Sequence, residues 1–220
     1  MKKPIAKLKI AGKTIGYMKE VSIKEFCKPK SKSMISVIGI TANTDQAGKD
    51  SAASFINEYY SQKYENEKFA KPLKQMIASM TGESMEYLET TTFKDALLPS
   101  QWDIDGTPQT GRDLMIMIGH GLRQLQPNIW VNAMDERFLN NPNPIIITDV
   151  RYRNEIEWIR SNNGVVVHIV RGKTKENRNL AEQQLDGYRG HDVILENNAG
   201  LWDLRDKVRV FCDSLVDTSL

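Results

Sequence analysis

The chain has 220 residues, of which 40% are hydrophobic and 26% charged, a composition typical of a soluble globular protein with one main core. Its apolar runs fall far short of the roughly 20 residues that span a bilayer, and none follows the first lysines, so we expect neither a membrane span nor a signal peptide. The two cysteines, Cys27 and Cys212, match no metal spacing, which predicts reduced thiols in a cytoplasmic protein, in the host cytoplasm if the source is viral.

The net charge of +2 conceals an asymmetry along the chain. Residues 1–33 hold ten lysines and two glutamates, a net charge of +8, so the remainder carries −6. This basic extension either binds nucleic acid or another polyanion, or is a solvated lysine-rich arm, and no aromatic stacking pattern accompanies it. Apolar residues on both sides of Ala11 and Gly12 predict a hairpin. Residues 28–33 are expected to be a linker, and residues 34–220 the main domain.

A strand, a loop and a helix are expected at the start of the main domain. Residues 34–40 form a short apolar, β-branched run, which is typical of a buried parallel strand. After a loop, Ala52, Phe55, Ile56 and Tyr59 recur at the spacing of one helix face.

Strands and helices alternate along the rest of the chain. Strands are expected at 144–149, 164–170 and 192–195, and helices at 72–80, 111–125, 129–139, 155–160 and 201–215. The helix that begins at Gly111 should bury a stripe that runs from Leu114 to Leu125. Residues 83–110 are polar and turn-rich, and their secondary structure is left open. The alternation predicts an α/β fold with a mostly parallel sheet and helices on both faces. Together with the phosphate-binding pattern described next, it predicts a P-loop NTPase-like three-layer fold.

The main chemical signal is a near match to the phosphate-binding pattern G-x-x-x-x-G-K-[ST]. In such a loop, backbone N–H groups and a helix N-terminus face the phosphates, and the lysine places its charge on the β- and γ-phosphates. The predicted ATP phosphate-binding residues are Asn43, Thr44, Asp45, Gln46, Ala47, Gly48, Lys49, Asp50 and Ser51. Asn43 replaces the first glycine, and asparagine tolerates a left-handed φ better than most residues. Asp50 stands where Ser or Thr is usual, so either Asp50 or Ser51 is expected to serve Mg²⁺.

A second signal is the run of isoleucines at 145–147 that ends in Thr148 and Asp149 and resembles a Walker B strand. An aspartate at the carboxyl end of a strand lies where ligands bind in open α/β sheets, so Asp149 is a candidate for contact with Mg²⁺ or the acceptor. The alternative is an aspartate that caps a helix or stabilises a turn. Arg151 follows closely and is a candidate for contact with a phosphate, whereas a surface role is the better interpretation for Arg153.

A third signal is the pair Arg112 and Arg123, eleven residues apart on one predicted helix and therefore on the side opposite Leu114. They are interpreted either as anion clamps or as solvated arginines. Trp130 either stacks on a base or belongs to the core, and His120 is interpreted as structural.

A fourth signal is the polar, basic segment 171–190, with Arg171, Lys173 and Arg178. Such a segment either closes over the phosphates as a lid and excludes water, or is an ordinary charged loop.

Several stretches together resemble the deoxynucleoside monophosphate kinases of tailed bacteriophages. They occur in the order of that family, cover residues 34–215, and leave the first 33 residues outside. The stretches are AGKDSAASFI, FAKPLK, GRDLMIMIGHGL followed by NIWV, IITDVRYRNEIE and GVVVHIVR.

The resemblance implies transfer of the γ-phosphate of ATP, with Mg²⁺, to a deoxynucleoside monophosphate (dNMP). It implies acceptor helices over residues 70–140, and two departures there, Lys71 and Gly121 in place of usual acids, bear on base or sugar preference. The implied catalytic residues are Lys49, Arg112, Arg123, Asp149 and Arg151; the acceptor-binding residues Phe69, Lys71, Pro72, Leu73, Arg112 and Trp130; and the metal-binding residues Asp50, Ser51 and Asp149.

Two alternatives stay open. One is a P-loop kinase for another small acceptor, and the other is a nucleotide-binding protein without turnover whose basic arm binds DNA. Nucleic acid is not expected to bind the kinase domain itself. The sequence does not decide the oligomeric state, and a homodimer is the commonest assembly by base rate.

Overall fold

The computed structural model describes residues 8–10, 13–15, 35–44, 46–61, 63–141, 143–172 and 180–217. The chain divides into two compact units. The first, here called the sheet unit, comprises Met1–Lys68 and Asn141–Leu220. The second, the helical unit, comprises Phe69–Asn140.

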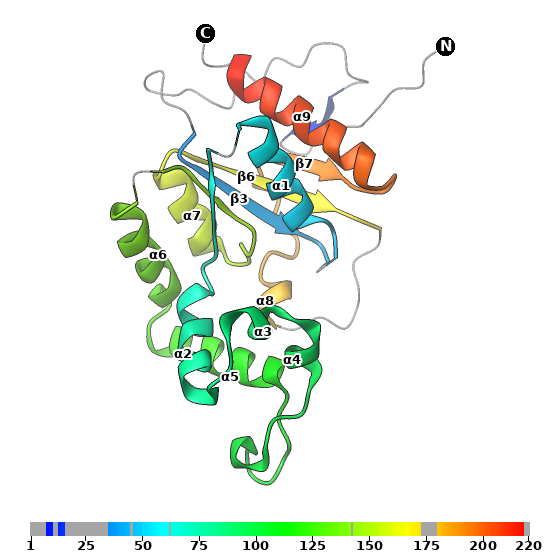
Figure 1. Ribbon diagram of the computed structural model, residues 1–220. Coiled ribbons are helices and arrows are strands. Elements are labelled where there is room, and N and C mark those ends of the chain that lie inside the picture. The colour runs from blue at the N-terminus through cyan, green and yellow to red at the C-terminus, as the bar shows by residue number, and fades with distance from the viewer. Residues whose placement is uncertain are drawn as a thin grey trace. The chain divides into compact units, whose positions relative to one another are not determined.

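The sheet unit is built on a sheet with the strand order β2-β1-β7-β6-β3-β5-β4 (Figure 1). The five strands from β7 to β4 run parallel, while β1 and β2 form an antiparallel hairpin that joins the β7 edge. This confirms the predicted α/β class with a mostly parallel sheet. The strands are β1 Leu8–Ile10, β2 Lys13–Ile15, β3 Val37–Ala42, β4 Glu65–Glu67, β5 Ile145–Ile147, β6 Gly164–Val170 and β7 Val193–Glu196.

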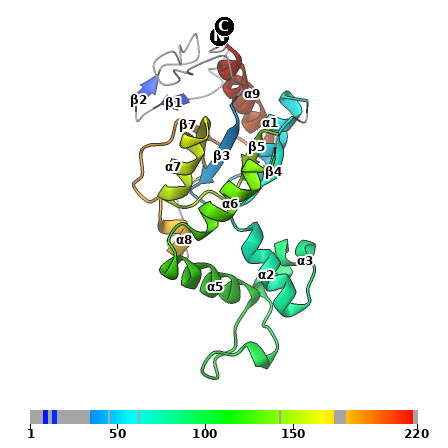
Figure 2. The same cartoon turned by 90° about the vertical axis from the view of Figure 1, so that its left-hand side faces the viewer.

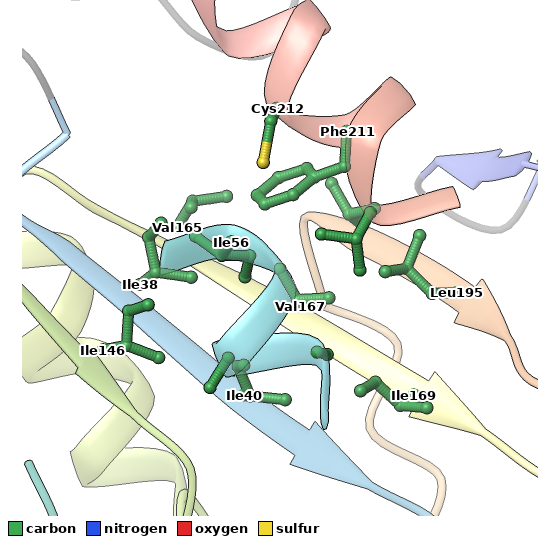
Figure 3. Packing of buried hydrophobic residues seen from close by; sticks show 14 of the residues in the cluster. Ile38, Ile40, Ile56, Ile146, Val165, Val167, Ile169, Leu195, Phe211 and Cys212 are labelled. Atoms are coloured by element: carbon green, nitrogen blue, oxygen red, sulfur yellow. The ribbon is translucent and has the colours of Figure 1, made fainter. Parts of the chain in front are cut away.

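Helices cover both faces of this sheet. On one face, alternate strand residues such as Ile38 and Val167 pack with Ile56 of α1 and Phe211 of α9 in a single buried cluster (Figure 3). On the other face, α7 packs so closely on β3 that a Cβ on Gly39 would lie 2.4 Å from the Ile159 side chain. The helices of this unit are α1 Lys49–Tyr59, α7 Arg153–Ser161, α8 Leu180–Gln183 and α9 Leu201–Asp217.

Strand β4 has no counterpart in the sequence prediction. Its residues, Glu65–Glu67, are all polar and carry no apolar alternation. They become a strand because they pair with the buried β5 at the edge of the sheet. The Glu65 carboxylate also accepts hydrogen bonds from Asn141 and Asn143, at 2.9 and 2.6 Å.

The helical unit contains the two long helices predicted at 111–125 and 129–139, with those bounds (Figure 2). Gly82 ends α2 in the left-handed conformation, with φ of 76°. The predicted burial of Leu125 is wrong, since this side chain is 85% exposed. Helix α5 ends at Leu125, whereas its buried residues, Gly111 and Leu114, lie near its start. The helices are α2 Lys71–Thr81, α3 Met85–Glu89, α4 Thr91–Asp95, the 3-10 turn η1 Ser100–Trp102, α5 Gly111–Leu125 and α6 Ile129–Leu139.

Candidate functional site

Four neighbouring parallel strands bring polar side chains to the same edge of the sheet. Strand β3 pairs with β5 on one side and with β6 on the other, and β6 pairs with β7. A sheet of this kind binds ligands outside the carboxyl ends of its strands, at the point where the strand order reverses. The segments that leave this edge are the 43–48 loop, Thr148–Asp149, Arg171–Gly172 and Asn197–Asn198.

The 43–48 loop is curled, as a phosphate-binding loop must be. The N–H of Ala47 donates to the carbonyl of Thr44 at 3.3 Å, and Gly48 adopts φ of 105°, a left-handed conformation that favours glycine. Helix α1 begins at the next residue, Lys49, so its N-terminal N–H groups adjoin the loop. The described part of the loop therefore has the curvature and the helix N-terminus of an anion nest.

Asn43 does not use the backbone freedom that the sequence suggested, since it is not among the residues with positive φ. Its side chain instead connects β3 to the end of β6. The side-chain carbonyl accepts from the Arg171 N–H at 2.9 Å, and the side-chain amide donates to the Arg171 carbonyl at 3.4 Å. The Arg171 guanidinium then donates to the carbonyl of Gln46 at 3.0 Å. Asn43 thus holds the loop where a glycine would give only flexibility.

Lys49 lies half-buried at the start of α1, in the electrostatic neighbourhood of His168 on β6. Burial, the neighbouring His191 ring and the Lys49 charge lower the pKa of His168 to about 3. His168 shares a 2.6 Å hydrogen bond with the buried Thr41 hydroxyl and stacks on His191, with ring centroids 4.2 Å apart. The imidazole is therefore neutral at physiological pH and adds no positive charge beside the lysine.

Asp149 follows β5, and it does not cap the next helix. Tyr152 occupies the N-cap of α7, and the buried Glu155 carboxylate accepts from the N–H groups of Arg151 and Tyr152, at 2.7 and 3.1 Å. The N-cap position of α7 therefore belongs to Tyr152 and not to Asp149. The hydrogen bond to Glu155 fixes the backbone of Arg151, a half-buried residue.

The residues predicted to bind metal fit a Mg²⁺ ion that is coordinated partly by nucleotide phosphates. In the described part of the chain, no three His, Cys, Asp or Glu side chains gather in a metal cage. Mg²⁺ in nucleotide sites usually has one or two protein oxygens and completes its shell with phosphate and water. Ser51 near the start of α1 and Asp149 carry such oxygens in the segments that follow the adjacent strands β3 and β5, while Asp50 is exposed.

The helical unit holds the residues predicted for the acceptor. Phe69 and Leu73 are buried. Trp130 is also buried, and its Nε1 donates to the Gly119 carbonyl at 3.2 Å, which favours the core interpretation of this ring. Arg112 forms a 3.0 Å ion pair with Asp95.

Of the other predicted acceptor and lid residues, some are described by the structure and some are not. In the helical unit, Lys71, Pro72 and Arg123 are partly exposed. In the sheet unit, Arg171 is exposed and contacts the phosphate loop. Asp45 of the loop and the predicted lid residues Lys173 and Arg178 fall in the gaps between the described segments.

Comparison with known proteins then identifies the family. Residues 90–208, more than half of the chain, match the deoxynucleotide monophosphate kinase family. The chain belongs to this family. A proposed deoxynucleotide monophosphate kinase of Acanthamoeba polyphaga mimivirus is 25% identical over 167 residues, which are 69% of this chain and 83% of that protein. Deoxynucleotide monophosphate kinases are phosphotransferases of deoxynucleotide metabolism. The loop at 43–51 precedes the matched range.

Two further findings concern cysteine and membrane predictions. Cys212 is a free, buried thiol, and burial raises its pKa to about 12. Cys27 is not among the residues that the structure describes. No described helix is both long and apolar enough to cross a membrane.

Sequence reasoning missed the asparagines after β7. Asn197 donates to the carbonyl of Ala47 at 2.7 Å, and Asn198 accepts from the N–H of Gly172 at 2.8 Å. The available signal was two consecutive asparagines between a predicted strand and a predicted helix, close before Gly200.

Proposed function

We propose that this member of the family transfers the γ-phosphate of ATP to a deoxynucleoside monophosphate and releases ADP and the diphosphate. The observation that carries the proposal is the curled loop between β3 and α1, with left-handed Gly48 followed by Lys49 at the helix start. Phosphoryl transfer needs little covalent chemistry from a protein, so positioning and neutralisation of charge account for most of catalysis.

Each group has a role in this scheme. The backbone N–H groups of the 43–51 segment hold the ATP phosphates, and Lys49 neutralises charge on the β- and γ-phosphates. Ser51 and Asp149 are the side chains that would hold Mg²⁺, which would neutralise negative charge on the phosphates. Arg151 and Arg171 are positioned by backbone contacts and contribute further positive charge at the same sheet edge.

The helical unit is proposed to supply the acceptor site. Arg112 and Arg123 on α5 are the candidate anion clamps, and the α2 segment with Lys71 and Pro72 contributes to the surroundings of the monophosphate. Because Trp130 is buried, it supports the packing of this unit rather than offering an open ring face. The family assignment supports a deoxynucleotide acceptor.

The proposal is tested by a coupled assay of ADP release with ATP, Mg²⁺ and each dNMP and NMP in turn. We expect at least one dNMP to give ADP release well above the rate without acceptor. The other candidate, a kinase for a different small acceptor, would show ADP release with none of the nucleotides. A chain that binds ATP and releases no ADP with any acceptor would contradict both kinase assignments.

A further inference from the structure

We propose that Asn197 is the positioning residue of the phosphate loop: its side-chain amide sets the orientation of the Ala47–Gly48 peptide and thereby the affinity for ATP. This inference rests on the proposed function. It concerns a residue that follows strand β7 and lies 150 positions away from Ala47 in sequence.

The contact itself is buried and short. The Asn197 side chain is 5% exposed, and its Nδ2 donates to the Ala47 carbonyl at 2.7 Å. The Asn197 N–H donates to the Val170 carbonyl, also at 2.7 Å, so the residue is fixed to the end of β6 as well. Asn197 is thus held by hydrogen bonds of both its backbone and its side chain, which restrict its movement.

Peptide geometry converts this contact into control of the anion site. In a trans peptide the carbonyl and the following N–H point in opposite directions. When Asn197 draws the Ala47 carbonyl into the interior, the Gly48 N–H must point away from that asparagine, out of the core. An anion nest needs successive N–H groups that converge on the ligand, and Gly48 supplies one immediately before the lysine.

Gly48 is constrained by the same neighbours. A Cβ at this position would lie 2.8 Å from Asn197 Nδ2 and 3.0 Å from a Leu204 methyl group. The left-handed φ of 105° adds a second reason for glycine. Asn197 and Leu204 therefore pack directly against this part of the loop.

The side-chain oxygen of Asn197 indicates that stability alone does not explain why an asparagine occupies this position. Asn197 Oδ1 is buried without a hydrogen-bond partner among the described residues. A buried acceptor without a partner destabilises a fold, and a leucine of similar volume would not carry that cost. An asparagine is favoured here because it supplies the donor to Ala47.

Two substitutions and one matched control test this. Asn197→Asp keeps the shape but replaces the donor with an oxygen that faces the Ala47 carbonyl, and Asn197→Leu removes both polar atoms. The control is Asn57→Leu on α1: Asn57 is also 5% exposed, and its side chain bonds the Tyr64 N–H at 3.1 Å, away from the loop. Kd for ATP is measured by calorimetry, KM for ATP and for dNMP by initial rates, and Tm without nucleotide.

We expect Asn197→Asp to weaken ATP binding about ten- to a hundredfold and Asn197→Leu about tenfold, the range for a buried hydrogen bond near a charged ligand. KM for dNMP should stay within about twofold in both, since the contact orients only the ATP loop. Asn57→Leu should lower Tm and leave KM for ATP within about twofold, because a general loss of stability does not select one substrate.

Three outcomes overturn the inference, and they are distinguishable. If both Asn197 variants bind ATP as the wild type does, while Lys49→Met loses affinity or turnover, the positioning role is wrong and the kinase assignment stands. If the wild-type chain itself binds no ATP, the proposed function fails, and the inference fails with it. An Asn57→Leu variant that raises KM for ATP as much as Asn197→Leu would also reduce Asn197 to a structural residue.

Discussion

The phosphate edge of the sheet unit and the helical unit hold their polar side chains in different ways. At the sheet edge, the asparagines Asn43, Asn197 and Asn198 bond to backbone groups of neighbouring strand ends, so the position of the loop follows from the sheet. In the helical unit, two charged pairs join side chain to side chain, Arg112 with Asp95 and Lys74 with Glu89. An edge fixed through backbone contacts suits the constant part of a reaction, the ATP phosphates. Side-chain pairs on helices can change without loss of the fold, which suits the part that differs between substrates.

The sharpest test of the phosphate edge is Lys49→Met. If backbone contacts alone fix the position of the loop, this substitution removes the positive charge of Lys49 beside the transferred phosphate and leaves the loop in place. We expect kcat to fall by about 10²–10³-fold or more, the effect of removing one stabilising group from a preorganised site, with Tm nearly unchanged. The matched control is Lys63→Met, an exposed lysine outside the site, which should keep the wild-type rate. Near-wild-type turnover in Lys49→Met would refute the assignment of the loop.

The stacked histidines next to the loop predict that the sheet unit loses stability in acid. The pKa values of His168 and His191 are lowered, mainly by burial, to about 3 and about 4 from an ordinary 6.5. As the pH falls below 6.5, the unfolded chain binds protons that the folded chain does not, so the free energy of unfolding decreases. This loss begins near pH 6.5 and continues down to about pH 4 for His191 and about pH 3 for His168.

His191→Phe isolates one of the two rings. Phenylalanine keeps the stack on His168 and the edge contact with Tyr188 but binds no proton. Urea unfolding between pH 4.5 and 7.5 should show about half the wild-type pH dependence, because one proton is taken up instead of two. His120→Phe, at an exposed position of α5, serves as the control and should keep the full dependence. An unchanged slope in His191→Phe would place the acid sensitivity elsewhere.

The helical unit is tested by Arg112→Ala. The ion pair with Asp95 joins side chains that are 41% and 58% exposed, and such surface pairs add little to stability. If Arg112 also binds the acceptor phosphate, KM for dNMP should rise about tenfold while Tm changes little. Asp95→Asn breaks the pair but leaves the arginine, so KM should not rise. Equal KM values for the wild type and Arg112→Ala would assign Arg112 to the ion pair alone.

The two regions also differ in how far sequence predicts them. The loop between β3 and α1, strand β6 and helices α5 and α6 were predictable because each is specified by a local pattern: a motif, a β-branched run or a helical repeat. Strand β4 was not, because Glu65–Glu67 becomes a strand only through pairing with β5. Asn197 was not, because its role depends on contact with a residue 150 positions away. Local patterns predict elements, whereas the contacts that orient a site are set by the fold.

The smallest expected effect is at Leu125, where a local pattern gave the wrong answer. The helical repeat places Leu125 on the same stripe as Leu114, yet the two are 85% and 2% exposed. Leu114→Ala should lower the free energy of unfolding by about 2–5 kcal/mol, the cost of a cavity in a packed core. Leu125→Ala should change it by less than about 0.5 kcal/mol, as for other surface substitutions. Urea unfolding of both variants measures the difference. A large loss at Leu125 would mean that this side chain is covered in the folded protein in solution, and the end of α5 would then belong with the buried part of the helical unit.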